Sequence, residues 1–574
     1  MDSRTSTIFE GHRLTFVMSF TTFTLLSLFS WQNLFQSGFT SSIVTQSGDP
    51  GLLIWMIAWF PHAIEHGLNP FYSNYIYSST GINLMDNISV FTLGALFSPI
   101  TILFGPIVSY NLAVIMAPIA SGLSMVFFLT KLSKNRLACF LGGLIFAYSP
   151  IATAELKFGH FQTAFSAFIP LISAQCYDIV ITNSQKWIKN GLILAALIAL
   201  EFFISLEALS VFILLSIIFI APNLKRLLSS PVIIKTFLLS LLVDTVILIY
   251  PSWFFFFGKS HFNGSIWNHI GRLSATLKSL LVPHGQDNII NYIARANVEY
   301  IGVVLITFIA IFSIKFFKHS TFRYITIFTI TAILLTLGSH LTISTFSIPF
   351  LYKLIGQIPG LQDIMPIRIA TATYFGIGTF IALVVNKYYT DFINAKNMRT
   401  SIYERRFKNY LLVSIFALIS VLSVLIYNPW PYQVSSISIP RLLHEPYTPL
   451  NSTIVEYPPA TGSNSKSMIY QSELGFKYRL FDGYGVISDV NGKPTESPRD
   501  SSFYFLIIAT SLGRLSSLLT NSQSQLLHSS LKESKITEVF VLGDSNTKFL
   551  VADLDLTLGK PRYTYENEYL WYVN

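Results

Sequence analysis

The chain has 574 residues and a formal net charge of +9, and 52% of its residues are hydrophobic whereas only 12% are charged. Soluble domains carry about 25% charged residues, so this composition excludes an ordinary soluble protein and indicates an integral membrane protein. The basic residues gather in short loops, which membrane topology explains without nucleic acid as a partner. The two cysteines, Cys139 and Cys176, lie in apolar runs, so neither a disulfide framework nor a thiolate metal site is expected.

Eleven apolar runs predict membrane-spanning helices, because a bilayer core needs about 20 apolar residues per helix. The predicted spans are 14–35, 107–130, 137–153, 163–182, 190–205, 207–221, 236–256, 299–317, 322–341, 366–386 and 409–427. With a cytoplasmic N-terminus, the basic short loops all fall on the cytoplasmic side of an inner membrane. This topology requires that residues 90–105 do not cross, and Pro99 within them favours an interfacial or re-entrant helix. An ordinary short span is the alternative.

The last part of the chain, from residue 428 onward, is rich in Pro, Ser, Thr and Tyr and is predicted to lie outside the membrane. Strand-like runs are expected at 452–459, 466–471, 536–543, 548–556 and 569–573, with a helix-like run at 504–520. They predict an extracytoplasmic α/β domain at 428–574, following a membrane module at 1–427.

The first outer loop combines an acid with an absence of cations. Residues 36–106 contain Asp49, Glu65 and Asp86 but neither Lys nor Arg. Asp49 follows the first span, where a carboxylate could act as general base on an acceptor hydroxyl. It could equally cap the following helix, since Pro50 comes next. The acidic loop favours the catalytic reading, and Asp49 is the predicted catalytic residue.

Further candidate side chains lie in outer segments. His62 and His66 are four residues apart on one helix with Glu65 between them, which is the spacing of a metal pair, but no HExxH motif is present. A solvated or lipid-facing helix surface is the competing interpretation, and Trp55 and Trp59 are expected to anchor this helix at the membrane interface.

A second polar cluster is predicted at the outer end of the third and fourth spans. It comprises Glu155, His160 and Gln162, with Lys157 beside them. A lone His is usually structural, but this cluster faces the same side as Asp49, so both interpretations stay open.

Arg368 begins the tenth span, and a guanidinium there suits a phosphate that it can hold with two hydrogen bonds. A snorkelling interfacial Arg is the alternative. The outer loop 257–298 is also cationic and suits an anionic lipid-phosphate donor, or is simply solvated; its charged residues are Lys259, His261, Arg272, Lys278, His284, Asp287 and Arg295.

Several motifs resemble those of the GT-C class of bacterial polytopic glycosyltransferases, which are related to the YfhO-type membrane proteins. They are GDPGLLIWMIAWFPHAIEHGLNPF, TGINLMDNISVFTLGALFSPITILFGPIVSYN, LSKNRLACFLGGLIFAYSP followed by GHFQ, MPIRIATATYFG, and YQSELGFKYRLFDGYG. The resemblance implies a catalytic acid in the first outer loop, matched by Asp49, with interfacial helices at 51–67 and 90–105. Many members have a second acid where this chain has His160, so no metal ligands are predicted, although the class admits Mg²⁺ or Mn²⁺.

The resemblance implies an inverting transferase that moves a sugar from a polyprenyl-phosphate donor to a lipid or glycan acceptor on the outer face of the membrane. Two other functions are compatible with the sequence: a transporter or flippase for lipid-linked sugars, and a non-catalytic assembly protein of the cell envelope. Transporters keep polar groups near the bilayer midplane. Here Asp244 is the exception among apolar spans, which favours chemistry at the outer surface. The sequence does not identify the sugar, the acceptor, the carrier length or the oligomeric state.

Overall fold

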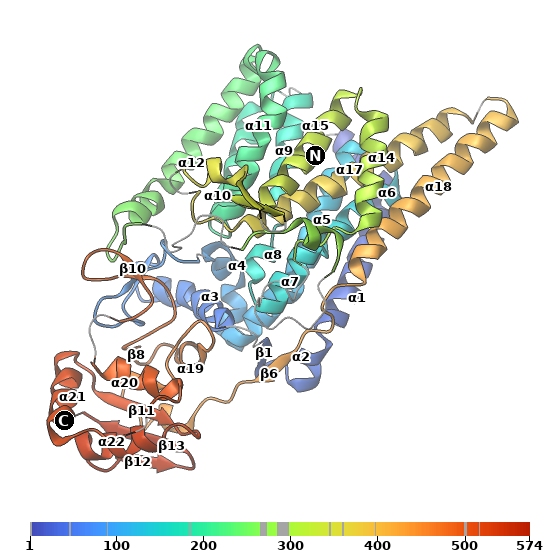
Figure 1. Cartoon of the computed structure of the whole chain (residues 1–574). Coiled ribbons are helices and arrows are strands. Elements are labelled where there is room, and N and C mark those ends of the chain that lie inside the picture. The colour runs from blue at the N-terminus through green and yellow to red at the C-terminus, as the bar shows by residue number, and fades with distance from the viewer. Residues whose placement is uncertain are drawn as a thin grey trace. The chain divides into compact units, whose positions relative to one another are not determined.

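The structure is a computed structural model (Figure 1). It describes residues 3–44, 48–88, 90–182, 185–264, 273–283, 298–343, 346–358, 361–396, 398–498, 502–515 and 517–573. The chain divides into two compact units. Unit 1 comprises Met1–Gln32, Val114–Leu248 and Trp267–Tyr432, and unit 2 comprises Asn33–Ala113, Ile249–Ile266 and Gln433–Asn574. This differs from the expected division at residue 427, because the first outer loop packs with the C-terminal part.

Unit 1 is helical. Its long helices are α1 (Ser3–Ser30), α5 (Pro106–Leu132, which begins in unit 2), α6 (Arg136–Ala147), α7 (Pro150–Phe158), α9 (Phe168–Thr182), α10 (Trp187–Phe202), α11 (Leu206–Leu228), α12 (Pro231–Phe257, which ends in unit 2), α14 (Val303–Phe316), α15 (Ser320–Thr336), α17 (Ala370–Asn394) and α18 (Thr400–Leu425). Its short elements are α8 (Phe161–Ala164), α13 (Leu277–Leu281), α16 (Tyr352–Ile355), η2 (Pro366–Ile369) and the antiparallel pair β4 (His340–Ile343) and β5 (Phe346–Pro349).

Helix α17 lies at the centre of unit 1 and packs against α6, α15 and α18. Glycines permit its close approach to α6. A Cβ atom on Gly142 would lie 2.7 Å from the carbonyl oxygen of Gly378, and one on Gly378 would lie 2.6 Å from that of Gly142. Small residues at such crossings are how membrane helices bring their backbones together.

The predicted spans all fall on helices. Within the described residues, eight helices or helix pairs are long and apolar enough to cross a membrane: Arg13–Ser30, Pro106–Leu132, Arg136–Phe158, Phe161–Ile181, Leu206–Leu228, Pro231–Phe257, Pro366–Asn394 and Thr400–Leu425. The other three predicted spans correspond to α10, α14 and α15, which have 16, 14 and 17 residues. The polytopic helical fold is confirmed, and length and composition support eight of the eleven spans.

Unit 2 contains the predicted α/β domain, which is confirmed. Its sheet has the strand order β12-β13-β11-β7-β8, with β11, β7 and β8 parallel and the other pairs antiparallel. These strands are β7 (Thr453–Tyr457), β8 (Arg479–Leu480), β11 (Glu538–Leu542), β12 (Tyr563–Tyr565) and β13 (Glu568–Tyr572). Its helices are α19 (Lys466–Glu473), α20 (Ser502–Ser511), α21 (Asn521–Glu533) and α22 (Lys548–Leu558). The domain core lies between the sheet and α20, α21 and α22.

Two of the expected strands are helices. Residues 466–471 lie in α19 and residues 548–556 in α22. In α22 the buried Leu550, Asp553 and Leu554 recur at i, i+3 and i+4, which is the period of a helix face rather than of a strand. The helix expected at 504–520 ends at Ser511.

The first outer loop forms the rest of unit 2. Its elements are α2 (Gln32–Ser37), β1 (Ser42–Val44), α3 (Asp49–Glu65), β2 (Tyr72–Ser73), β3 (Ile82–Asn83) and α4 (Phe91–Phe104). The later elements of the unit are β6 (Val434–Ser436), η3 (Arg441–Leu443), β9 (Ile487–Ser488) and β10 (Pro494–Thr495), and β6 pairs with β1.

Helix α3 packs against α4 and α19. The two tryptophans expected at the membrane interface are instead buried here: Trp55 and Trp59 are 0% and 1% exposed. Trp55 Nε1 donates a 2.6 Å hydrogen bond to Gln471 Oε1, and Trp59 Nε1 donates a 3.0 Å bond to the carbonyl of Pro70. The contacts of α19 with α3 therefore make these rings part of the core of unit 2.

Candidate active site

Asp49 is the first residue of α3 and is half-buried. The hydroxyl of Tyr484 donates a hydrogen bond to Asp49 Oδ1, with 2.9 Å between the oxygens. The backbone before the helix is fixed by the C-terminal part: Gly48 N donates to the carbonyl of Gly462 at 2.9 Å. A Cβ atom on Gly48 would lie 2.3 Å from the carbonyl oxygen of Thr461, so only glycine fits this close approach.

Asp49 is not the N-cap residue of α3, as one of the two interpretations of the sequence expected, but the residue after it. Gly48 occupies the N-cap position and Asp49 is already helical, with Pro50 in the first turn. A carboxylate in the first turn still interacts favourably with the helix dipole, but this effect is modest at about 0.3–1 kcal/mol. Helix capping therefore does not explain why an acid is present at position 49, and it does not explain the hydrogen bond from Tyr484.

The other candidate residues of α3, His62 and Glu65, lie further along the helix. His62 packs among aromatic rings: its centroid lies 4.2 Å from that of His66 and 4.5 Å from that of Phe476. Burial, followed by the charge of His66, lowers the pKa of His62 to about 4. Glu65 is exposed in the last turn. In the part of the chain that the structure describes, no three His, Cys, Asp or Glu residues gather as metal ligands.

Asp86 forms a buried pair with His261. The Asp86 side chain is 2% exposed, and its Oδ2 lies 3.1 Å from Nδ1 of His261, whose side chain is 22% exposed. The backbone N–H of Phe262 also donates to Asp86 Oδ2, at 3.4 Å. Burial raises the pKa of Asp86 to about 7, although His261 opposes the rise.

Unit 1 brings the second predicted cluster together with Arg368 (residues Glu155, His160, Arg368 and Glu207). Arg368 Nε donates to Glu155 Oε1 at 3.2 Å, and its Nη1 donates to Glu207 Oε2 at 2.9 Å. Glu155 Oε2 lies 2.6 Å from Nδ1 of His160. Glu207 also accepts a hydrogen bond from the backbone N–H of Met365 at 2.9 Å. Two carboxylates thus neutralise the guanidinium that was expected to meet a phosphate.

Two polar side chains of unit 1 are buried with unsatisfied oxygens. Glu201 is 0% exposed and Gln162 is 4% exposed. Neither carboxylate oxygen of Glu201, nor Oε1 of Gln162, has a hydrogen-bond partner among the described residues. Glu201 lies near the outer end of a predicted span, but its carboxylate is not exposed to solvent.

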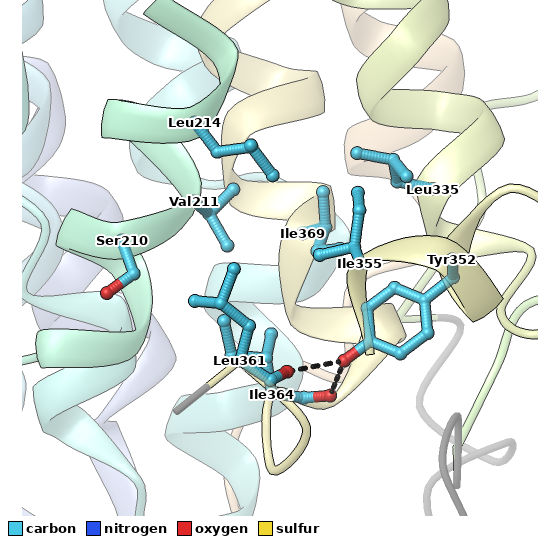
Figure 2. A pocket seen from close by; sticks show the side chains of 9 residues that line it. All are labelled: Ser210, Val211, Leu214, Leu335, Tyr352, Ile355, Leu361, Ile364 and Ile369. Carbon is cyan, nitrogen blue, oxygen red and sulfur yellow. Dashed lines mark hydrogen bonds between the residues drawn. The ribbon is translucent and has the colours of Figure 1, made fainter. Parts of the chain in front are cut away.

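A small apolar hollow lies in unit 1 between α11, α15, α16 and η2, with a cavity volume of about 10 Å³ (Figure 2). Its lining is Ser210, Val211, Leu214, Leu335, Tyr352, Ile355, Leu361, Ile364 and Ile369. The Tyr352 hydroxyl donates to the carbonyls of Leu361, at 3.1 Å, and Ile364, at 2.5 Å (Figure 2). Ile364 and Ile369 flank the segment that carries Arg368, so the hollow borders the ion pairs.

Sequence reasoning missed two groups. Tyr484 was not singled out, although it lies in the motif YQSELGFKYRLFDGYG. His261 was one of several charges in a cationic loop, and nothing local linked it to Asp86. Of the other charges in that loop, Arg272, His284, Asp287 and Arg295 lie outside the described residues.

Comparisons with known proteins identify the architecture. No protein-family model matches the chain, and no curated protein matches its sequence. It aligns with the arabinofuranosyltransferase AftD from Mycobacteria over 98% of this chain and 42% of AftD, with 12% identity and a TM-score of 0.52. The chain thus spans less than half of AftD, and at this identity the likeness is one of fold.

Two further solved structures align less closely. ArnT from Cupriavidus metallidurans in the apo state matches over 98% of each chain, with 11% identity and a TM-score of 0.46. Archaeal oligosaccharyltransferase AglB from Archaeoglobus fulgidus, in complex with an inhibitory peptide and a dolichol-phosphate, matches over 96% of this chain and 72% of that one, with 12% identity and a TM-score of 0.47. The fold of this chain thus resembles that of the arabinofuranosyltransferase AftD, and its C-terminal part forms an α/β domain.

Proposed function

We propose that this protein is a membrane glycosyltransferase that moves a sugar from a polyprenyl-phosphate donor to a lipid or glycan acceptor. The reaction takes place at the outer face of the inner membrane, with inversion at the anomeric carbon. The observation that carries this proposal is the half-buried carboxylate of Asp49, held by Tyr484 at the start of α3. It lies in a segment, residues 36–106, without Lys or Arg to neutralise it.

Asp49 acts as the general base. Its carboxylate takes the proton of the acceptor hydroxyl while the hydroxyl oxygen attacks the anomeric carbon from the face opposite the phosphate. A bond from the acceptor oxygen to that carbon forms, and the bond from the carbon to the phosphate oxygen breaks. The electron pair leaves with the lipid phosphate, which is a stable anion and needs no strong general acid. Cationic side chains stabilise the charge that develops on it.

Tyr484 positions the base. Its hydrogen bond occupies Oδ1 of Asp49 and fixes the plane of the carboxylate, so that Oδ2 can be presented to the acceptor. A hydrogen bond to the charged form also favours the ionised carboxylate that a base requires. Through Tyr484 the C-terminal domain takes part in the active site.

Two features of unit 1 suit the lipid donor. The lining of the hollow in Figure 2 is almost entirely hydrocarbon, as a polyprenyl chain would require, but the hollow would have to widen to receive one because it now has room for about one water molecule. Arg368 stays a predicted phosphate ligand, but it already donates to Glu155 and Glu207. To bind phosphate with both of these N–H groups, it would have to release those carboxylates.

The class that the sequence resembles admits a divalent metal, but no step of this scheme depends on one. Among the described residues, no three His, Cys, Asp or Glu side chains gather as metal ligands.

The test is incubation of the purified protein with a panel of polyprenyl-phosphate sugars, measuring acceptor-dependent release of the lipid phosphate. We expect release from at least one donor, and its loss in Asp49→Asn. Asp544→Asn is the matched control, since Asp544 accepts a 3.0 Å bond from Tyr457 in the same unit. Absence of release from every donor, or equal loss in the control, contradicts the proposal.

A further inference from the structure

We propose that the turn Lys259–His261, backed by Asp86, is a binding site for the phosphate group of a phosphate ester. The choice of this ligand rests on the proposed function, because a transferase of this kind must hold the phosphate that leaves. The argument uses residues of unit 2, all within described segments.

The turn is held in an unusual conformation. His261 N donates to the carbonyl of Gly258 at 3.1 Å, so Lys259 and Ser260 are the central residues of a β-turn. Ser260 has a φ of +61°, in the left-handed region that favours glycine. The Ser260 hydroxyl donates to the carbonyl of Thr80 at 2.8 Å and so holds the turn in this form. Residues kept in such conformations cluster at functional sites and ligand clamps.

Asp86 orients the imidazole of His261. Asp86 Oδ2 lies 3.1 Å from Nδ1 of His261, and the Asp86 side chain is only 2% exposed. With Nδ1 engaged, Nε2 is the ring nitrogen left for a ligand, and it donates to a phosphate oxygen when the ring is in its protonated form. The imidazole keeps 22% of its surface exposed. A buried carboxylate that fixes the tautomer of a His in this way is how proteins prepare the other ring nitrogen for binding or proton transfer.

The turn itself carries a lysine, and a hydroxyl without a hydrogen-bond partner among the described residues lies beside it. Lys259 Nζ stands 4.5 Å from the ring centroid of Tyr72, which confines the ammonium group. The Tyr72 hydroxyl donates to the carbonyl of Thr80 at 3.4 Å, the same carbonyl that Ser260 uses. Thr80 Oγ1 is buried without a hydrogen-bond partner among the described residues. The ammonium, imidazole and hydroxyl groups together can donate several hydrogen bonds to the oxygens of a phosphate.

The place of the turn in the chain suits a phosphate-bearing lipid. It follows directly on α12, whose residues Pro231–Phe257 are long and apolar enough to cross a membrane. The phosphate of a membrane lipid lies at the level where such a helix ends. Arg368 by contrast donates to the carboxylates of Glu155 and Glu207, whereas the Asp86 carboxylate at this turn is paired with the imidazole of His261.

One short segment connects this site to the catalytic acid. Tyr484 binds Asp49, and two residues later Val486 exchanges two hydrogen bonds with Asn87, at 2.7 and 2.9 Å. Asn87 follows Asp86 directly in the chain. Two extended residues span at most about 7 Å, so the anchors of the base and of the phosphate site are close together on unit 2.

The test measures binding by calorimetry on the detergent-solubilised full chain, with inorganic phosphate and with citronellyl phosphate as probes. We expect both to bind, and His261→Asn, Lys259→Gln and Asp86→Asn to weaken binding by about tenfold or more, as loss of a charge-assisted hydrogen bond does. The controls are His444→Asn and Lys493→Gln, at exposed positions of the same unit. Each variant is first checked for wild-type thermal unfolding, and Lys259→Gln, at an exposed position, carries the test if the others fail to fold.

Binding of both probes that falls in the site variants and not in the controls supports the proposal. Tighter binding of citronellyl phosphate than of inorganic phosphate assigns the ligand to a lipid source, and equal affinity assigns it to the phosphate group alone. No binding of either probe to the wild type, or unchanged affinity in Lys259→Gln, overturns the site. Phosphate binding without sugar transfer from any donor contradicts the proposed function but still supports the phosphate site.

Discussion

The hydroxyl of Tyr484 donates a hydrogen bond to Oδ1 of Asp49 across 435 positions of sequence, with 2.9 Å between the two oxygens. Asp49 belongs to the first outer loop and Tyr484 to the C-terminal part, and both lie in unit 2. The bond ties the proposed base to a domain that its place in the sequence assigned to a separate module. It makes the role of the C-terminal domain in catalysis testable.

Removal of this hydroxyl should slow turnover without unfolding the protein. We expect Tyr484→Phe to lower kcat about tenfold, because the carboxylate loses its fixed orientation and a hydrogen bond to its charged form. The acidic limb of the pH–rate profile should move to higher pH, which a purely structural role would not cause. Tyr457→Phe removes a comparable Tyr–Asp bond and serves as the control. An unmoved profile in Tyr484→Phe would remove the positioning role.

We predict that Arg368 is essential for stability, in addition to its predicted role as a phosphate ligand. Arg368→Ala should lower the free energy of unfolding by about 3–5 kcal/mol, because it leaves Glu155 and Glu207 without their cation in a largely buried site. Arg368→Lys keeps the charge and loses the planar fork, so stability should recover in part. Thermal unfolding and donor KM separate the two roles. A raised KM with unchanged unfolding would show a phosphate ligand rather than a structural ion pair.

The stability of unit 2 should fall as pH rises from about 4 to about 7. Burial raises the pKa of both Asp482 and Glu538 to about 7, well above the usual values of these acids. The folded state therefore binds more protons than the unfolded state in this window, so each acid stabilises the fold fully below pH 4 and loses that contribution as pH rises through 7. Unfolding of the full chain measured against pH checks this. Asp482→Asn should flatten the curve, and an unchanged slope in that variant would contradict the assignment.

The topology predicts that the C-terminal domain is outside and the loop before α18 is cytoplasmic. Ser522 lies on the exposed surface of α21 and Ser401 on that of α18, which makes both suitable for labelling, whereas Ser465 is buried against Gly48. In intact cells a membrane-impermeant maleimide should label Ser522→Cys and spare Ser401→Cys, with the wild type as baseline. Labelling of Ser401→Cys but not of Ser522→Cys would show that the orientation is the opposite of the predicted one.

Composition and periodicity predicted the architecture because they depend on local properties. Apolar runs predicted where the helices lie, and the short β-like runs around Thr453–Tyr457 and Glu538–Leu542 predicted two core strands. The same reasoning failed at 548–556, which forms a helix although Asp553, Leu554, Asp555 and Leu556 alternate polar and apolar as a strand would. Local pattern alone does not decide such short segments.

The sequence predicted individual residues of the candidate site but not the contacts between them. Asp49 was found because an acid without nearby cations is unusual in a basic membrane protein. Its partner Tyr484, and the pairing of Arg368 with Glu155 over 213 positions, arise from tertiary packing that no local spacing encodes. For the same reason Trp55 was expected at the lipid interface, although α19 covers it.

The most direct test of the central claim is the turnover of Asp49→Asn. Because Gly48 holds the N-cap position, the change should alter stability little, and the variant should fold, insert and bind donor as the wild type does. If Asp49 is the base, lipid-phosphate release should fall at least about a hundredfold, as loss of general-base catalysis does. Near-normal turnover by Asp49→Asn, in an assay where the wild type is active, would contradict the account.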